Sequence, residues 1–256
     1  MKYTVIQTAF WPTIRTLSEC FDEKTLFVWD VDGTLIYPND VVFYPQYIAL
    51  NPYTTLAEEI ECTKPHGLSD SRAICARWYD AWSRAPFVLM HPDVPTTIKN
   101  LQAHHITNIA LTYLLVRNLD GRDFVQWRVD QLKRLEIDFS GAFDACPRLQ
   151  LDEVLAANKV QASAENWVYA PAYQDGVLLT HNFSKSLCLE ALLRRLKFLP
   201  KCIFFVDDLE DNVQVIGELC KKLDIDFVGI HYVGVQHLPG DWTEEKVLKK
   251  WSEISK

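Results

Sequence analysis

The sequence lacks several features that would assign it to a particular class of protein. Its 256 residues contain no run of about 18 apolar residues, so no membrane-spanning helix is predicted. The stretch from Met1 to Leu17 includes Arg15 and polar breaks, and it has no apolar core followed by a cleavage-like site, so no signal peptide is predicted. We therefore expect a cytoplasmic protein, or one that is secreted by a system that needs no signal peptide.

Paired cysteines and an excess of basic residues are also missing. The seven cysteines are an odd number without a Cys-x-x-Cys motif, which favours free thiols in a reducing compartment. The chain has 26 Lys and Arg against 34 Asp and Glu, a formal net charge of −8. That balance argues against a nucleic-acid partner, whose electrostatic footprint is basic. A phosphorylated substrate held by a metal ion and a few cations remains compatible with it.

Acidic residues are concentrated where predicted strands end. Thr25 to Trp29 is an apolar run typical of a buried strand, and Asp30 and Asp32 follow it, with Gly33 and Thr34 next. In open α/β sheets, ligands bind just outside the carboxyl ends of the strands. Two carboxylates this close repel each other unless a cation or a shared proton offsets the charge, and Mg²⁺ suits such a site. The alternative is a strand that simply ends in an Asp-Gly turn.

A second acidic cluster follows the strand predicted over Ile203 to Val206. The cluster contains four acidic residues, Asp207, Asp208, Glu210 and Asp211, and Asn212 follows it. An apolar strand that leads into four acids is costly unless a cation is bound there. The cap of a helix N-terminus is the alternative, and it accounts well for one acid but poorly for four.

Two further residues occupy positions of interest. Thr112 stands at the end of the strand predicted over Ile106 to Leu111, although Thr at a strand end is common. Lys185 opens a helix predicted over Ser186 to Leu196, where a cation opposes the helix dipole. Such a locally unfavourable choice is more expected at a site than on an indifferent surface, where Lys185 would be an exposed lysine at a helix end.

The alternation of strands and helices predicts one α/β domain over residues 1–256, with a three-layer, Rossmann-like parallel sheet. A helical, cap-like insert is expected over 37–92, with a helix from about Asp70 to Arg84 whose apolar residues share one face. A smaller insert over 142–182 includes a β-hairpin around Tyr173 to Gly176. The first insert is either a lid over the crevice or padding against the sheet edge.

Taken together, these positions resemble the four signature motifs of the haloacid dehalogenase (HAD) superfamily, in the same order. Asp30-x-Asp32-Gly33-Thr34 resembles motif I, Thr112 motif II, Lys185 motif III and Asp207-Asp208 motif IV. Two segments, Gly176 to Thr180 and Phe227 to Tyr232, are also similar to a little-characterised bacterial HAD family with members in intracellular bacteria. Some relatives of that broad kind are secreted effectors with protein phosphatase activity.

The resemblance implies a role for each motif residue. Asp30 would be the nucleophile and Asp32 the general acid and base. Thr112, Lys185 and the backbone N–H groups after Asp30, near Gly33 and Thr34, would hold the phosphoryl oxygens.

The same resemblance implies a metal site. Mg²⁺ would be held by Asp30, Asp208 and the main-chain carbonyl of Asp32, with support from Asp207 and from Asp211 or Asn212. Arg117 departs from the superfamily pattern, because four residues separate it from Thr112 where many relatives have an arginine soon after the threonine. It is either a phosphate contact or a solvated loop arginine.

The function implied is a Mg²⁺-dependent phosphatase that forms an aspartyl-phosphate, with a phosphorylated small molecule or a phosphoprotein, for example one carrying phosphotyrosine, as its substrate. The alternatives are a phosphotransferase of the same fold and a catalytically idle binding or effector protein. The departure after Thr112 and the eight tryptophans motivate the idle alternative. The sequence makes no prediction about the oligomeric state.

Overall fold

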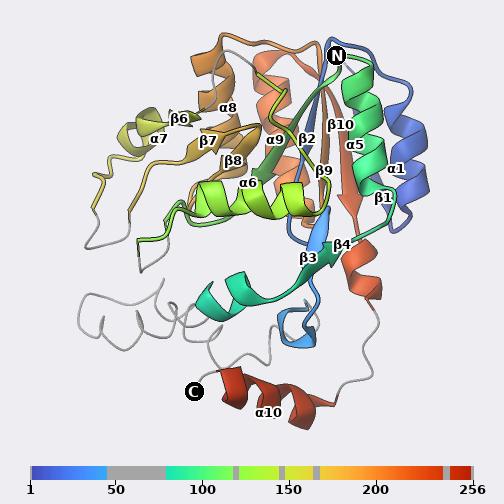
Figure 1. Ribbon diagram of the computed structural model, residues 1–256. Coiled ribbons are helices and arrows are strands. Elements are labelled where there is room, and N and C mark those ends of the chain that lie inside the picture. The colour runs from blue at the N-terminus through green and yellow to red at the C-terminus, as the bar shows by residue number, and fades with distance from the viewer. Residues whose placement is uncertain are drawn as a thin grey trace.

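The computed structural model describes residues 2–44, 79–117, 121–143, 148–163, 168–238 and 243–254. Within these ranges, eight strands form one sheet in the order β1-β10-β9-β2-β5-β8-β7-β6 (Figure 1). The strands are β1 Tyr3–Thr8, β2 Thr25–Trp29, β5 Thr107–Thr112, β6 Arg148–Gln150, β7 Ala172–Gln174, β8 Val177–Leu179, β9 Cys202–Asp207 and β10 Asp226–Tyr232. Neighbours from β1 to β8 are parallel, and β8, β7 and β6 are antiparallel.

Helices cover both faces of this sheet. One face packs against α1 Trp11–Ser18, α5 Val94–Ala103 and α6 Phe124–Arg134, and the other against α7 Asp152–Ala157, α8 Lys185–Leu196 and α9 Glu210–Leu223. Strand β2 shows why both faces are apolar: Phe27 and Trp29 belong to the first core, and Leu26 and Val28 to the second. All five residues of β2 are buried, as expected for a central parallel strand. The predicted three-layer, Rossmann-like α/β class is confirmed.

The predicted hairpin is present, and it is part of the main sheet. Strands β7 and β8 are joined by Asp175 and Gly176, which have φ values of 47° and 78°. Two consecutive residues with positive φ are the signature of a type I′ hairpin turn. Tyr173 and Gln174, which were predicted in the turn, lie in β7. Because β8 pairs in parallel with β5, the hairpin extends the sheet at this side.

A smaller unit lies beyond the carboxyl ends of the central strands. Strand β3 Ile36–Pro38 pairs with β4 Phe87–Leu89 as an antiparallel two-stranded sheet, followed after β3 by the short helix η1 Val41–Phe43. Residues 79–84 are helical, and the rest of the helix predicted over Asp70 to Arg84 lies outside the described residues. Since 45–78 lie outside them too, the lid role of the insert stays a prediction.

The C-terminal part of the chain returns to this smaller unit. After η2 Gly234–His237, helix α10 Glu244–Ile254 contacts η1, and Val247 of α10 is fully buried (Figure 1). No helix in the described ranges has both the length and the apolar content of a membrane span.

Candidate active site

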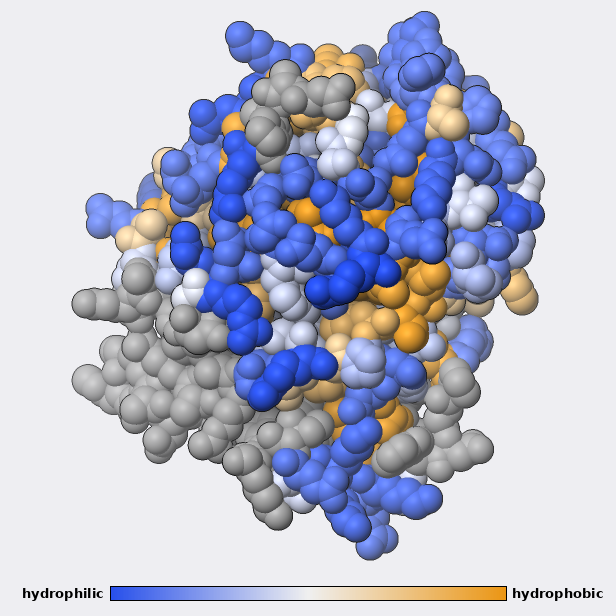
Figure 2. All heavy atoms as spheres, in the orientation of Figure 1, coloured by the Kyte–Doolittle hydropathy of each residue, from blue (hydrophilic) through white to orange (hydrophobic). Residues whose placement is uncertain are grey.

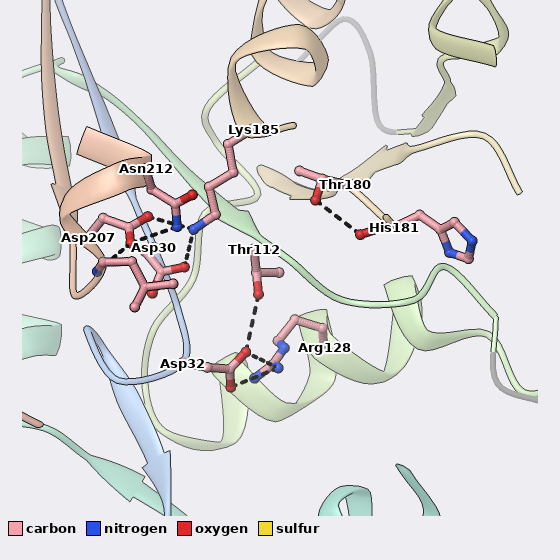
Figure 3. Close-up of polar contacts among 10 residues, drawn as sticks. Asp30, Asp32, Thr112, Arg128, Thr180, His181, Lys185, Asp207 and Asn212 are labelled. Carbon is pink, nitrogen blue, oxygen red and sulfur yellow. Dashed lines mark hydrogen bonds and ion pairs between the residues drawn. The ribbon is translucent and has the colours of Figure 1, made fainter. Parts of the chain in front are cut away.

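Three neighbouring strands bring the motif residues to one edge of the sheet. Strands β9, β2 and β5 are adjacent and parallel, so their carboxyl ends meet. Asp207 is the last residue of β9, Asp30 directly follows β2 and Thr112 is the last residue of β5. The acids that are distant in sequence therefore lie side by side, where α/β sheets bind ligands (Figure 3).

Lys185 bridges two of these acids. It is the first residue of α8, and its side chain is only 2% exposed. Its Nζ donates one hydrogen bond to Asp30 Oδ1 and another to Asp207 Oδ2, and the distance from Nζ to Asp207 Oδ2 is 2.6 Å. Burial by itself would lower the pKa of Lys185, but the charges of Asp207 and Asp30 outweigh it and raise that pKa above its usual value. The ammonium group is therefore charged and bound between two carboxylates.

Asp207 also organises the start of α9. Its Oδ1 accepts hydrogen bonds from the backbone N–H of Leu209 at 2.9 Å and from Asn212 Nδ2 at 3.0 Å. Both oxygens of Asp207 are thus bound by protein donors. Asp211 is exposed in the first turn of α9, without a place in this network of contacts. The N-cap of α9 is Leu209, which has no side-chain cap hydrogen bond, so Asp207 supports the turn before the helix and is not its cap.

The remaining acids fit a divalent cation. Asp30, Asp207 and Asp208 each offer an oxygen within 4.8 Å of the others. Asp30 Oδ2 is buried and has no hydrogen-bond partner among the described residues. Because Asp207 is already saturated by protein donors, Asp30 and Asp208 are the better candidates for metal ligands. Carboxylate oxygens crowded in this way repel one another, and one of them accepts no hydrogen bond from the described residues. Such a group of oxygens suits Mg²⁺.

The electrostatics of these acids agree with that fit. Burial raises the pKa of Asp30 to about 7, with Lys185 opposing and Asp207 adding to the rise. Burial, followed by repulsion from Asp30 and Asp207, raises the pKa of Asp208 to about 8. The single ammonium of Lys185 therefore does not offset all three carboxylates, and additional positive charge would lower both pKa values.

Gly33 lets the two acidic segments approach each other. Its φ is +85°, and a Cβ placed on it would lie 2.6 Å from Asp208 Oδ2. Its N–H donates to the carbonyl of Ile36 at 2.8 Å, and the N–H of Thr34 donates to the carbonyl of Val31 at 3.4 Å. The N–H groups of Gly33 and Thr34, near which phosphate binding is predicted, are thus engaged within their own loop. The Thr34 hydroxyl is buried and has no partner among the described residues.

Asp32 faces a different cation, which the sequence analysis did not identify. Arg128 Nη2 donates to Asp32 Oδ1 at 2.9 Å and to Oδ2 at 2.7 Å, and Thr112 Oγ1 donates to Asp32 Oδ2 at 3.2 Å (Figure 3). Arg128 is fully buried, and its guanidinium lies 5.1 Å from the ring centroids of both Trp82 and Trp127. Arg128 stands four residues after Phe124, so it lies on the buried face of α6. This helical spacing was the signal in the sequence that could have marked Arg128 as a buried cation.

Two residues lie at the margin of the site. His231 of β10 has its Nε2 3.2 Å from the main-chain oxygen of Asp208, and it too was not predicted. Arg117 is exposed, and it pairs in an isolated β-bridge with Asp123. The contacts described for Arg117 therefore do not join it to the acidic cluster.

Comparison with known proteins gives distant relatives. A Chlamydia pneumoniae protein named as a candidate outer membrane protein is 22% identical over 243 residues, covering 91% of this chain and 80% of that protein. An uncharacterised protein of Rickettsia prowazekii is 22% identical over 228 residues, covering 89% of this chain and 76% of that protein. Neither name describes a chemical activity.

Solved structures similar to this chain include HAD-domain proteins. The HAD domain of the effector protein Lem4 from Legionella pneumophila (inactive mutant) is 12% identical, covers 88% of this chain and 91% of its own, and has a TM-score of 0.39. A haloacid dehalogenase-like hydrolase of Streptococcus pneumoniae is 12% identical and has a TM-score of 0.42, and the match covers 89% of this chain and 98% of that protein. These are proteins of the superfamily that the motifs resemble. A family model described as "Protein of unknown function (DUF2608)" matches residues 7–256, and the chain belongs to that family.

Proposed function

We propose that this chain is a Mg²⁺-dependent phosphohydrolase that cleaves phosphate monoesters through an aspartyl-phosphate at Asp30. One observation carries the proposal: the buried ammonium of Lys185 is shared by Asp30 and Asp207, while no described residue donates to Asp30 Oδ2. A carboxylate held on one oxygen by a buried lysine, at the end of a central strand, has the fixed orientation that attack on phosphorus requires. The HAD-like order of the motifs supports the same assignment.

The two chemical steps use Asp30 and Asp32 in turn. An oxygen of Asp30 attacks phosphorus, the bond from phosphorus to the leaving oxygen breaks, and Asp32 gives that oxygen a proton. Asp32 then removes a proton from water as the water oxygen attacks the aspartyl-phosphate. The bond between Asp30 and phosphorus breaks, which yields inorganic phosphate and restores both carboxyl groups.

Lys185 and Thr112 would support these steps. Lys185 holds Asp30 in place and supplies positive charge beside the group being transferred. Thr112 donates to Asp32 in the structure, so it either orients that carboxyl or turns to a phosphoryl oxygen when substrate binds. Mg²⁺ bound by Asp30, Asp208 and the main-chain carbonyl of Asp32 would neutralise phosphate charge.

Phosphate release from p-nitrophenyl phosphate in the presence of Mg²⁺ tests the proposal. Asp30→Asn and EDTA should each abolish turnover, whereas Asp224→Asn, which changes an exposed aspartate remote from these contacts, should leave it intact. Circular dichroism should show that both variants are folded. Turnover that survives Asp30→Asn would refute the role of Asp30.

The alternatives give different results in the same assay. Transfer of phosphate to an added alcohol with no release to water would indicate a phosphotransferase. A lack of turnover on small esters and on phosphopeptides, with Mg²⁺ bound, would favour a catalytically idle binding protein.

A further inference from the structure

A cavity of about 280 Å³ opens beside the acids of the candidate active site. Asp32, Gly33 and Asp208 line it, together with residues of β3, η1 and η2. Among the described residues, six aromatic side chains also line it: Tyr37, Phe43, Tyr44, Tyr79, Trp82 and Tyr113. Figure 2 shows hydrophobic atoms at the surface near the level of β3 and β4, above the hydrophilic surface of α10.

The proposed chemistry directs the leaving group into this cavity. Asp32 would protonate the leaving oxygen, so the leaving group must lie next to Asp32. Because Asp32 is itself part of the cavity lining, the organic part of the ester enters the space bounded by the aromatic side chains.

The charge of the lining limits what that organic part can be. The described lining residues include Asp32 and Asp208 but no Lys, Arg or His. The buried Arg128, which lies outside the lining, donates to both oxygens of Asp32. A leaving group with a second phosphate or a carboxylate would therefore lie beside Asp32, and no Lys, Arg or His of the described lining would offset its charge.

The size and rigidity of the lining favour a flat ring. A cavity of roughly 150 Å³ is enough to bind benzene, so this one has room for a single ring and a short connection. Tyr37 and Tyr44 pack edge to face with centroids 5.7 Å apart, and Trp82 lies 5.1 Å from Phe87 and 5.5 Å from Trp127. Aromatic side chains that are already held by neighbours offer ring faces and edges at little ordering cost.

We propose that the substrate is a phosphate monoester whose leaving group carries a flat, uncharged aromatic ring, which binds between these aromatic side chains. This inference rests on the proposed phosphatase function. Two sources share the chemistry, namely free aryl phosphates and phosphotyrosine side chains of proteins. The reaction is the one given above, with the aromatic alcohol as the protonated product of the first step.

Benzyl phosphate and cyclohexylmethyl phosphate test this inference directly. Both release a primary alcohol that carries a ring of six carbons, so the two esters differ mainly in whether the ring is flat. We expect a kcat/KM that is roughly three- to tenfold higher for benzyl phosphate, expressed mainly in KM. Equal values, or a preference for the cyclohexyl ester, would overturn the inference.

Methyl phosphate separates this inference from the function on which it rests, because it is a phosphate monoester whose leaving group, methanol, is too small to need the cavity. Turnover of methyl phosphate without a benzyl preference would retain the phosphatase and remove the aryl substrate. No phosphate release from methyl phosphate or from either of the larger esters would remove the proposed function, and the aryl substrate with it.

Variants of the lining provide the second arm of the test. Tyr113→Leu changes a lining side chain that is 55% exposed, and Phe10→Leu changes one that is 72% exposed and outside the lining. The benzyl preference should fall toward one in Tyr113→Leu and stay at the wild-type value in Phe10→Leu. Tyr37→Leu is the second lining variant if Tyr113→Leu is poorly folded. An unchanged preference in the folded lining variants would contradict the assignment of the cavity.

Phosphotyrosine blocked as its N-acetyl amide, a phosphotyrosyl peptide and the matching phosphoseryl peptide distinguish the two sources. A kcat/KM that is higher for the phosphotyrosyl peptide than for the blocked amino acid supports a protein substrate, and equal values support small aryl phosphates. Equal or faster cleavage of the phosphoseryl peptide would overturn the aromatic preference.

Discussion

Two buried cations hold the two aspartates of motif I, and they do so differently. The Lys185 centre consists of Lys185, Asp30 and Asp207, and the Arg128 centre consists of Arg128, Asp32 and Thr112. In the first, one ammonium is shared between two carboxylates. In the second, one guanidinium nitrogen, Nη2, donates to both oxygens of a single carboxylate.

The difference lies in the charge balance. Asp208 stands close to the Lys185 centre, so three carboxylates share one ammonium there, whereas the Arg128 centre has one acid and one base. The Lys185 centre is therefore short of positive charge, and the Arg128 centre is not. This comparison favours the side of Asp30 and Asp208, and not the side of Asp32, for the proposed metal ion.

Removal of Lys185 should have the largest effect on stability. Lys185→Met leaves buried carboxylates without their cation, and we expect a loss of about 3–5 kcal/mol in the free energy of unfolding without Mg²⁺. Urea denaturation in EDTA measures it, with Lys201→Met, at an exposed lysine, as the control. Mg²⁺ should recover part of the loss. Equal stability of the two variants would contradict a charge-deficient centre.

The Arg128 centre should respond asymmetrically. Asp32→Asn leaves a fully buried guanidinium without a charged partner and should cost about 3 kcal/mol. Arg128→Met should cost less, about 1–2 kcal/mol, because the Asp32 side chain is 30% exposed and water can solvate it. The double variant should lose less than the sum of the two. Additive losses in urea denaturation would indicate that the pair is not coupled.

Stability should depend on pH in a way that Mg²⁺ changes. Folding raises the pKa of Asp30 from 3.8 to about 7 and that of Asp208 from 3.8 to about 8. Between pH 3.8 and about 8, the folded protein therefore binds more protons than the unfolded chain. The metal-free protein should therefore lose stability from these groups as the pH rises from about 4 to 8. Stabilisation by Mg²⁺ should be larger at pH 8 than at pH 6, since the ion binds carboxylates.

Thermal unfolding with and without Mg²⁺ at pH 6, 7 and 8 measures this dependence. Asp208→Asn removes one of the two titrating groups and should reduce both the pH dependence and the shift by Mg²⁺. A wild-type protein whose Mg²⁺ shift is the same at all three pH values would contradict the prediction.

Loss of the Thr112 hydroxyl should have the smallest effect on stability. Thr112→Val removes one hydrogen bond to Asp32, while both bonds from Arg128 remain, so the expected cost is about 1 kcal/mol or less. Turnover should fall more than stability if Thr112 contacts the phosphoryl group. Thr16→Val, on the exposed side of α1, is the control for stability. A cost above that of Arg128→Met would mean that Thr112, and not Arg128, is the main support of Asp32.

Local patterns in the sequence were enough to predict the main elements. The apolar runs of β2, β5 and β9 end directly at Asp30, Thr112 and Asp207, because buried parallel strands need apolar residues on both faces. The β7–β8 hairpin was predicted from its Asp-Gly turn. The β-branched and aromatic residues of 136–140 predict a short strand and a turn, but Glu136 has a φ of 60° just after α6, and the residues after it form a loop.

Pairings between distant segments were harder to predict. Residues 37–40 (Tyr-Pro-Asn-Asp) have the composition of a turn, but the first two lie in strand β3, whose antiparallel partner β4 follows only after the long insert. Arg128 stands within an apolar helical stripe, and its meaning depends on Asp32 lying opposite it. No local rule of period or capping carries that information.

The sequence by itself determined where acids, a hydroxyl and a lysine stand at strand and helix ends, because those positions follow from apolar periodicity and turn chemistry among adjacent residues. The tertiary structure alone decided which cation meets which acid. Lys185 is 155 residues from Asp30, and Arg128 is 96 residues from Asp32. Partners so far apart in the sequence are selected by the order of the strands in the sheet. The same order places three carboxylates around the single ammonium of Lys185, whereas Asp32 alone pairs with Arg128.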